Sequence, residues 1–248
     1  MEQSPSLLAA ITATFLLAGI VKGITGMGLP TVAMGVLGAF LSPLTAAGLL
    51  LVPSFVTNVW QLLAGPRFGA LGVRLWPMLL AIVAGTLLGS ALLADGDTAR
   101  TTTALGIALA AYATYTLFAR PLRVPARWER LASPLVGLTT GIVTGGTGVF
   151  VIPAVPYLQS LGLEKEDLIQ ALGLSFTVST LALAAGLGWH GAIPEKGWLA
   201  SLLALVPALL GMAVGQAIRT RLRPLVFRRV FLVGLLLLGL EMASRTLR

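Results

Sequence analysis

The sequence predicts an all-α, polytopic membrane protein with two inverted repeats of about five membrane segments each. Long apolar runs recur along the whole chain, which is 56% hydrophobic and 10% charged and has a mean hydropathy of +0.93. A glycine-rich phrase occurs once in each half, and the basic residues divide unevenly between alternate loops. This composition leaves no room for a separate soluble domain.

The first apolar run covers residues 7–41 and contains one charged residue, Lys22. As a single helix it would be about 50 Å long, whereas the hydrocarbon core of a bilayer is about 30 Å thick. The helix must therefore break, and the sequence GITGMGLP at residues 23–30 predicts where. Glycine removes side-chain support and proline removes a backbone donor. The break is either the tip of a re-entrant hairpin or a turn between two short spans.

The apolar segments divide into two sets of five on either side of a basic, proline-containing stretch. We expect membrane segments at residues 6–22, 28–41, 44–64, 75–94 and 101–118, and then at 131–144, 148–161, 168–188, 197–218 and 225–241. The organisation is a first membrane repeat (1–118), a cytoplasmic linker (119–130) and an inverted second repeat (131–248). The N-terminus lacks a basic n-region, so the first segment is expected to be a retained span.

Three echoes between the halves predict the repeat. GIVKGITG at residues 19–26 matches GIVTGGTG at 141–148 with an offset of 122. PSFVTN at 53–58 faces LSFTVS at 174–179, and the pair Gly85 and Gly89 corresponds to Gly211 and Gly215, which we interpret as helix-packing glycines. Each half therefore opens with a broken helix, an architecture typical of secondary transporters.

The loop charges distinguish two topologies by the positive-inside rule. If each broken segment crosses the membrane once, nine basic residues lie on one side and seven on the other. If each broken segment also turns back, the division becomes twelve against four. The second arrangement places the linker in the cytoplasm and both termini outside. The protein is expected to lie in the cell (inner) membrane.

Lys22 is the most informative single residue. An ammonium group at hydrocarbon depth costs several kcal/mol unless it reaches the interface, an anion or a cavity. It is either a topology anchor near the cytoplasmic surface or a cation that attracts an anionic substrate. Its repeat mate is Thr144, so any charge at the site is asymmetric.

The predicted substrate site combines this cation with the glycine-rich breaks and with a polar stripe. Backbone amides and threonine hydroxyls at the breaks could wrap an oxyanion, although the glycines could instead serve close helix packing. Ser54, Thr57, Asn58 and Gln61 share one helix face, and Ser175, Ser179 and Thr180 lie similarly in the second half. The predicted substrate-binding residues are Lys22, Gly23, Thr25, Gly26, Gly28, Asn58, Gln61, Thr144, Gly145, Gly146, Thr147, Gly148, Ser175 and Ser179.

The composition also excludes several kinds of chemistry. The chain has no cysteine and one histidine, His190, so disulfides, iron–sulfur clusters and histidine-rich metal sites are excluded. We expect no catalytic residue, metal or cofactor. No segment interior carries a carboxylate except Glu241 near the last end, whereas carboxylate relays mark proton-driven pumps. The net charge of +8 is interpreted as a mark of topology, with no nucleic acid partner.

The two breaks, GITGMGLP (23–30) and GGTGVFVIP (145–153), each end in a proline. A duplicated, all-membrane chain with such breaks resembles the sulfite exporter TauE/SafE (TSUP) family over nearly its whole length. It departs from the glycine triplet of many members at Met27 and Thr147. The resemblance implies a transporter of small anions such as sulfite, sulfoacetate or related organosulfur compounds. The expected partners are this anionic substrate and the lipid bilayer; a homodimer is left open.

Three other functions stay open at this stage. An importer of a similar anion, coupled to protons or sodium, differs from the exporter only in direction and energy source. An intramembrane hydrolase would use Ser175 as nucleophile and His190 as base, but GLSFT is not the G-x-S-x-G turn of such enzymes. A membrane scaffold would carry no flux.

Overall fold

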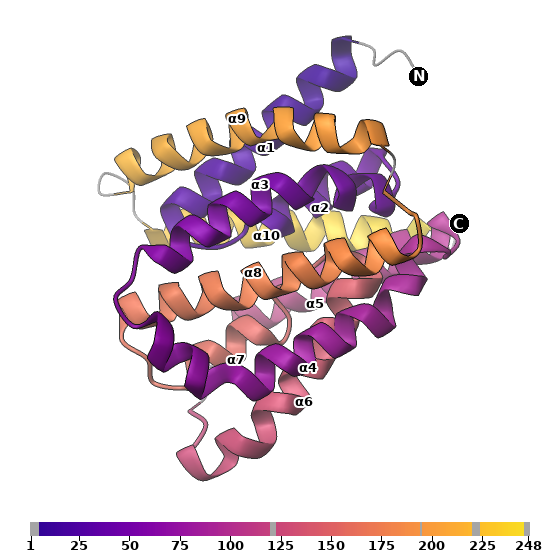
Figure 1. The fold of residues 1–248 in the computed structure, drawn as a ribbon. Coiled ribbons are helices and arrows are strands. Elements are labelled where there is room, and N and C mark those ends of the chain that lie inside the picture. The colour runs from indigo at the N-terminus through magenta and orange to yellow at the C-terminus, as the bar shows by residue number, and fades with distance from the viewer. Residues whose placement is uncertain (1–4, 120–122, 194, 220–223, 246–248) are drawn as a thin grey trace.

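The computed structural model describes residues 5–119, 123–193, 195–219 and 224–245, and it places helices and no strand among them (Figure 1). This confirms the predicted all-α class. The helices are α1 (Pro5–Thr25), α2 (Leu29–Phe40), α3 (Pro43–Leu63), α4 (Phe68–Ala94), α5 (Thr98–Phe118), α6 (Ala126–Thr147), α7 (Ala154–Ser160), α8 (Lys165–Trp189), α9 (Glu195–Ile218) and α10 (Pro224–Ser244). Each predicted segment overlaps one of these helices.

The helices differ from the predicted segments mainly where charged residues precede the apolar part. α4 begins at Phe68 and α6 at Ala126, several residues before the predicted starts at 75 and 131. Hydropathy marks only the apolar part of such helices, so the predicted segments begin after Arg74 in α4 and after Arg130 in α6. The predicted segment 148–161 is helical only in its second part, α7, because residues 149–152 form no helix.

The described helices are suited to a membrane by length and by surface. Five are long and apolar enough to cross a bilayer: α1, α3, α4, α8 and residues 198–218 of α9. Large apolar side chains point outward along α4 and α9, including Leu88, which is 72% exposed, and Leu203, which is 63% exposed. In a bilayer these side chains contact lipid. The chain is a multi-pass membrane protein.

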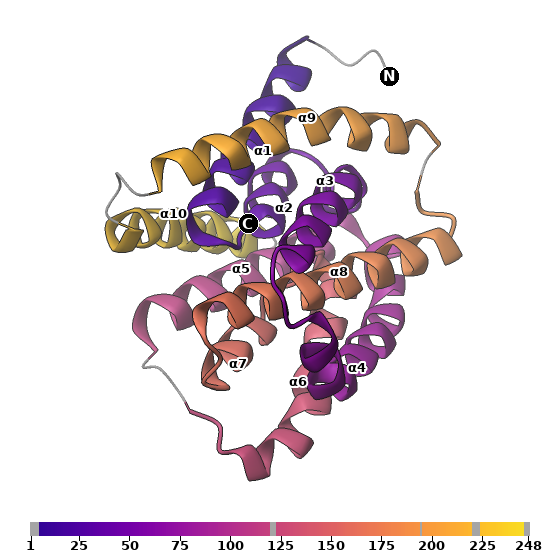
Figure 2. The ribbon, with the colours of Figure 1, turned by 60° about the vertical axis from the view of Figure 1, so that its left-hand side comes forward.

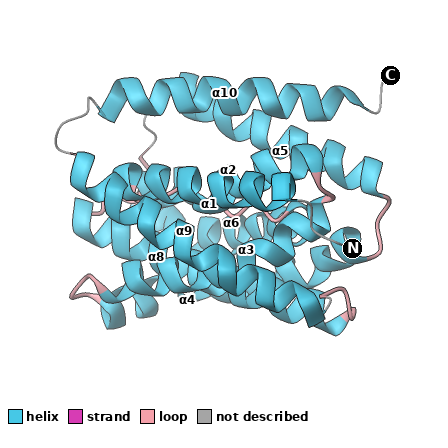
Figure 3. Ribbon diagram, turned by 90° about the horizontal axis from the view of Figure 1, so that it is seen from above, coloured by secondary structure: helices cyan, strands magenta, loops and turns pink. Residues whose placement is uncertain are grey.

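The closest packing joins helices of different halves. α1 packs on α9 and α4 packs on α6 (Figure 1), α3 crosses α8 near the centre (Figure 2), and α5 lies against α10 (Figure 3). Each broken helix, α1 or α6, therefore packs on the fourth helix of the other half. Two halves related by a two-fold axis would make these exchanged pairs. Their opposite insertion in the bilayer stays a prediction.

Glycines bring the backbones together at both crossings. A Cβ atom on Gly19 would lie 2.2 Å from the carbonyl oxygen of Ala208 in α9, and one on Gly141 would lie 2.3 Å from that of Ile82 in α4. No other residue fits such a contact, because a real Cβ atom stays beyond about 3 Å. This confirms that the two predicted small-residue pairs pack helices. The crossing glycines are Gly19, Gly23, Gly211 and Gly215 in α1 and α9, and Gly85, Gly89, Gly137, Gly141 and Gly145 in α4 and α6.

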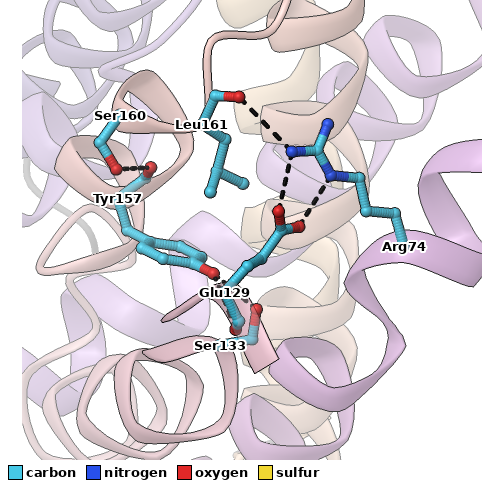
Figure 4. A network of polar contacts seen from close by, with 6 residues as sticks. All are labelled: Arg74, Glu129, Ser133, Tyr157, Ser160 and Leu161. Carbon is cyan, nitrogen blue, oxygen red and sulfur yellow. Dashed lines mark hydrogen bonds and ion pairs between the residues drawn. The ribbon is translucent and has the colours of Figure 1, made fainter. Parts of the chain in front are cut away.

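Ion pairs tie several helix ends together at one end of the bundle. Arg67 Nη1 lies 2.9 Å from Asp167 Oδ2, and Arg74 Nε lies 2.7 Å from Glu129 Oε1. Figure 4 shows that the Arg74 guanidinium also donates to the carbonyl oxygen of Leu161, at 3.4 Å. In the same network the hydroxyls of Ser133 and Tyr157 lie 2.6 Å apart. The starts of α4, α6 and α8 therefore share this end, which we call the basic end.

Two contacts at the opposite end join the ends of four helices in pairs. His190 Nδ1 lies 3.3 Å from Asp95 Oδ2, which joins the ends of α8 and α4. Arg245 Nη1 donates to the carbonyl oxygen of Ala39 at 2.8 Å, which joins the ends of α10 and α2. This grouping is the one that the ten-segment arrangement requires. Of the basic residues counted for it, Arg120, Arg221, Arg223 and Arg248 lie outside the described residues.

α3 contains a proline whose missing hydrogen bond is replaced from another helix. Pro53 has no N–H group to donate to the carbonyl oxygen of Leu49. Instead the hydroxyl of Ser201 in α9 donates to that oxygen at 2.9 Å and accepts the amide of Val52 at 3.0 Å. The contact fixes α3 against α9 just before the polar stripe of α3 begins.

The glycine crossings predict a large difference between two glycine substitutions. Gly215→Ala should lower the free energy of unfolding by about 1–3 kcal/mol, because its Cβ would lie 2.3 Å from the carbonyl oxygen of Ile20. Gly234→Ala, in α10, meets nothing within 4 Å and should be neutral or stabilise by up to about 1 kcal/mol. Unfolding in detergent measures both. Equal stabilities of the two variants would contradict the close crossing.

Candidate functional site

The two breaks are built alike. α1 ends before Gly26, whose φ is 77°, and α6 ends at Gly148, whose φ is 71°. In both cases the glycine amide donates to the carbonyl oxygen four residues earlier at 2.8 Å, to Lys22 in the first break and Thr144 in the second. Glycine adopts this left-handed conformation without steric cost, so the helix can end abruptly here. We call residues 26–28 the first break and 148–153 the second.

A threonine precedes each glycine and caps the turn. The hydroxyl donates to the carbonyl oxygen four residues earlier, at 2.9 Å for Thr25 and 2.6 Å for Thr147. The same oxygen accepts a hydrogen bond from the backbone amide two residues later, at 3.3 Å for Thr25 and 3.2 Å for Thr147. Because the single hydroxyl proton is used within the turn, neither threonine donates to a substrate in this conformation. Their predicted role in binding stays a prediction.

Lys22 lies in the last turn of α1 and is buried. Its side chain is 3% exposed and turns toward α3, where Nζ donates to Thr57 Oγ1 at 3.1 Å and to Asn58 Oδ1. This position differs from that of a topology anchor, which would extend to the interface. Within the described residues no carboxylate lies within 4.0 Å of Nζ. A buried cation is therefore held by neutral partners alone.

Hydrogen bonds continue from Lys22 across the bundle. Asn58 Nδ2 donates to Ser54 Oγ at 3.1 Å, and Thr180 Oγ1 donates to the same oxygen at 3.4 Å. All four side chains are buried, and Thr180 belongs to α8. The chain of contacts thus joins α1, α3 and α8, and it brings the polar stripe predicted on α3 into contact with the predicted cation.

Two hydroxyls on α8 lack partners. Ser175 Oγ and Ser179 Oγ are buried, and neither forms a hydrogen bond with any described residue. Both lie on one face of the helix, four residues apart. In the alignment of the halves, Ser179 corresponds to Asn58, so the second half carries neutral hydroxyls where the first half carries the lysine and asparagine. Burying a hydroxyl without a hydrogen-bond partner costs free energy. An anion that accepted hydrogen bonds from both serines would remove this cost.

Other predicted site residues have structural roles here. Gln61 Nε2 donates to the carbonyl oxygen of Ile169 at 2.8 Å and ties α3 to α8. Gly23 and Gly145 lie in the helix crossings, where a Cβ atom would meet backbone oxygens at 2.3 Å and 2.4 Å. Gly28, with φ of 104°, begins α2. Gly146 lies in the last turn of α6, within reach of Leu92 in α4. For Gly23 and Gly145 the packing interpretation accounts for the glycine, and their substrate role stays a prediction.

A cavity that sequence reasoning missed opens beside the first break. It has a volume of about 460 Å³, and Thr25, Met27 and Gly28 form one wall. The other walls include three basic residues from α8, the end of α9 and α10. These are Lys165, Arg219 and Arg228. The charge pattern placed them on one side of the membrane, but their convergence depends on how three helices pack.

The hydrolase interpretation is wrong in its geometry. Ser175 and His190 lie fifteen residues apart along α8, which corresponds to about 22 Å of helix. Ser175 is buried within the bundle, whereas His190 caps the helix and faces Asp95. A nucleophile and its base must come within hydrogen-bond distance, so these two residues cannot act as a pair.

A family model described as Sulfite exporter TauE/SafE matches residues 11–242. The chain belongs to the sulfite exporter TauE/SafE family. The match includes both breaks, the polar network and the cavity. Proteins of the TauE/SafE family are membrane transporters and not enzymes, which agrees with the sequence-based expectation. Comparison with curated proteins gave no match, and comparison with solved structures gave none either.

The Lys22 network predicts a non-additive effect of two substitutions. Asn58→Leu should lower the free energy of unfolding by about 1–3 kcal/mol, because it leaves the buried ammonium of Lys22 and the hydroxyl of Ser54 short of a partner. Adding Lys22→Met should recover most of this loss, since the unpaired cation is removed together with its acceptor. Unfolding in detergent measures both variants. A double variant that is less stable than Asn58→Leu would contradict the predicted coupling.

Proposed function

We propose that this TauE/SafE transporter exports a small oxyanion, sulfite or a related organosulfur anion, across the inner membrane by alternating access. The observation that carries the proposal is the buried ammonium of Lys22, held by Thr57 and Asn58 without a carboxylate among the described residues. A buried cation with no counter-charge is unfavourable, and an arriving anion supplies that counter-charge. Lys22 is therefore the residue expected to bind the substrate.

The polar donors on α3 and α8 fit an oxyanion better than a halide or a cation. Asn58 offers an amide donor, and Ser175 and Ser179 offer hydroxyl protons that no described residue accepts. We propose that the anion engages Lys22 together with these donors, because several directional donors match the several oxygens of sulfite or a sulfonate. In this proposal the anion replaces Asn58 as the partner of Lys22.

Access to Lys22 requires a movement, because its side chain is closed off in this conformation. The glycines of the first break, with φ of 77° and 104°, are positions where a small backbone rotation would swing the end of α1. α1 is held to α9 and α6 to α4 by backbone contacts through glycine. We therefore propose that α1 moves with α9, and α6 with α4, so that each moving body combines helices from both halves.

The proposed orientation makes export favourable without a coupling ion. The basic end is assigned to the cytoplasm and both termini to the outside, following the positive-inside rule. An anion that leaves a cell with a negative interior gains about 2.3 kcal/mol per charge per 100 mV. The membrane potential alone could then drive export.

Flux in proteoliposomes tests the proposal. Vesicles loaded with sulfite or sulfoacetate should release it when an interior-negative potential is imposed with no sodium or proton gradient. Lys22→Met should reduce this flux by at least about tenfold while the protein still inserts and folds. Flux that appears only with a sodium or proton gradient would contradict this mechanism and would indicate ion-coupled transport. Unchanged flux in Lys22→Met would refute the role of the lysine.

A second substitution separates a transport role of Lys22 from a structural one. Asn58→Asp should place a carboxylate beside the ammonium of Lys22, and the resulting ion pair would compete with the substrate anion for the lysine. We expect transport to fall by at least about tenfold while stability is kept or raised, because the buried charge gains a partner. Asn58→Ser is the matched control, since it removes the amide without adding charge and copies Ser179 of the second half. Full transport in Asn58→Asp would mean that the lysine has only a structural role.

A further inference from the structure

The cavity beside the first break brings three basic residues from different parts of the chain to one place. Arg67 and Arg74 are each paired with a carboxylate, Asp167 and Glu129. Unlike these two arginines, Lys165, Arg219 and Arg228 form no ion pair with any described residue, and none of the described residues that line their cavity is a carboxylate. Three unpaired cations from three helices therefore face one volume of about 460 Å³.

We propose that this cavity is a second anion site, at which a small dianion from the cytoplasm docks before it passes the first break and reaches Lys22. The inference rests on the proposed function for the later movement of the ion. Binding at the cavity does not depend on it.

The chemistry of the walls indicates a ligand with two negative charges. Arginine presents a planar fork of donors that matches two oxygens of a sulfite, sulfonate or carboxylate group, and lysine adds a point charge. With Arg219, Arg228 and Lys165 on different helices, a divalent ion can engage cations from more than one wall. The volume exceeds the needs of sulfite alone and also suits a short organic anion with a sulfonate at one end and a carboxylate at the other.

The cavity is in direct contact with the turn that must move. Thr25, Met27 and Gly28 form part of its wall, and the hydroxyl of Tyr112, another lining residue, donates to Met27 Sδ at 3.9 Å. Sulfur is a weak acceptor, so an oxyanion in the cavity would compete well for this hydroxyl. Docking would then loosen the hydrogen bond between Tyr112 and the sulfur of Met27. Lys22 lies one helical turn away, three residues before Thr25.

An anionic lipid headgroup offers the same oxyanion chemistry, and basic pockets between helices at the cytoplasmic side can bind lipids. The wall formed by the break favours a free ion. Thr25 ends α1, Gly28 lies in the turn between α1 and α2, and Tyr112 is buried within the bundle. A headgroup would have to reach past these elements.

Equilibrium binding to the full-length protein tests the inference. The protein is placed in nanodiscs of phosphatidylcholine alone, and binding of radiolabelled sulfate, sulfite and nitrate is measured. Sulfate and sulfite should bind more tightly than the monovalent nitrate. The variant Arg219→Gln with Arg228→Gln should weaken binding of the divalent ions by about tenfold. Arg229→Gln is the matched control, because it removes one charge next to Arg228 from an exposed residue that does not line the cavity.

Three further results separate this inference from its alternatives. If Lys22→Met keeps the arginine-dependent binding, the cavity is a site distinct from Lys22, and this holds even if the wild-type protein shows no flux. Equal binding by the double arginine variant and Arg229→Gln would overturn the inference, whether or not the protein transports. Binding of phosphatidylglycerol that depends on the two arginines, with no binding of sulfate in phosphatidylcholine, would assign the cavity to a lipid and overturn it as well.

Discussion

Backbone contact between glycines is the constraint on which the rest of the structure depends. α1 and α9, and likewise α4 and α6, approach so closely that a Cβ atom at either crossing would overlap a carbonyl oxygen. These contacts set the position of each broken helix from the opposite half of the chain. They therefore determine where the first break lies and where the side chain of Lys22 points. A substitution at a crossing glycine would act on the site without touching it.

With α1 held in this way, the charge distribution forms a gradient toward the interior. Paired residues, Arg67 and Arg74 among them, join helix ends at the rim of the basic end. Cations without an ion pair to any described residue line the cavity beside the first break, and the buried Lys22 lies one turn further in. For an anion, each step exchanges water for a more desolvated positive partner, which is how a membrane protein can lower the cost of carrying charge through hydrocarbon. The asymmetry between Lys22 and Thr144 gives the two breaks different chemistry.

The sequence predicted the parts of this account that depend on local pattern. Apolar length predicted the number of segments, glycine and proline predicted the first break, and the spacing of Ser54, Thr57 and Asn58 predicted a shared face. It could not predict that Lys22 turns inward, since an interfacial lysine has the same sequence signature. Nor could it predict the cavity, because Lys165, Arg219 and Arg228 are brought together by tertiary packing. The sequence predicted that Thr25 and Thr147 bind the substrate, and it could not predict that their hydroxyls donate within their own turns.

The central claim is that the transported anion binds the ammonium of Lys22, and locating the ion tests it most directly. Selenite has the shape and charge of sulfite, and its selenium atom can be found by anomalous diffraction from crystals of the protein. The account predicts a selenium peak with an oxygen within about 3 Å of Lys22 Nζ, together with a shift of Asn58 away from the lysine. Ordered selenite elsewhere in the bundle, with the contact between Lys22 and Asn58 intact, would contradict it.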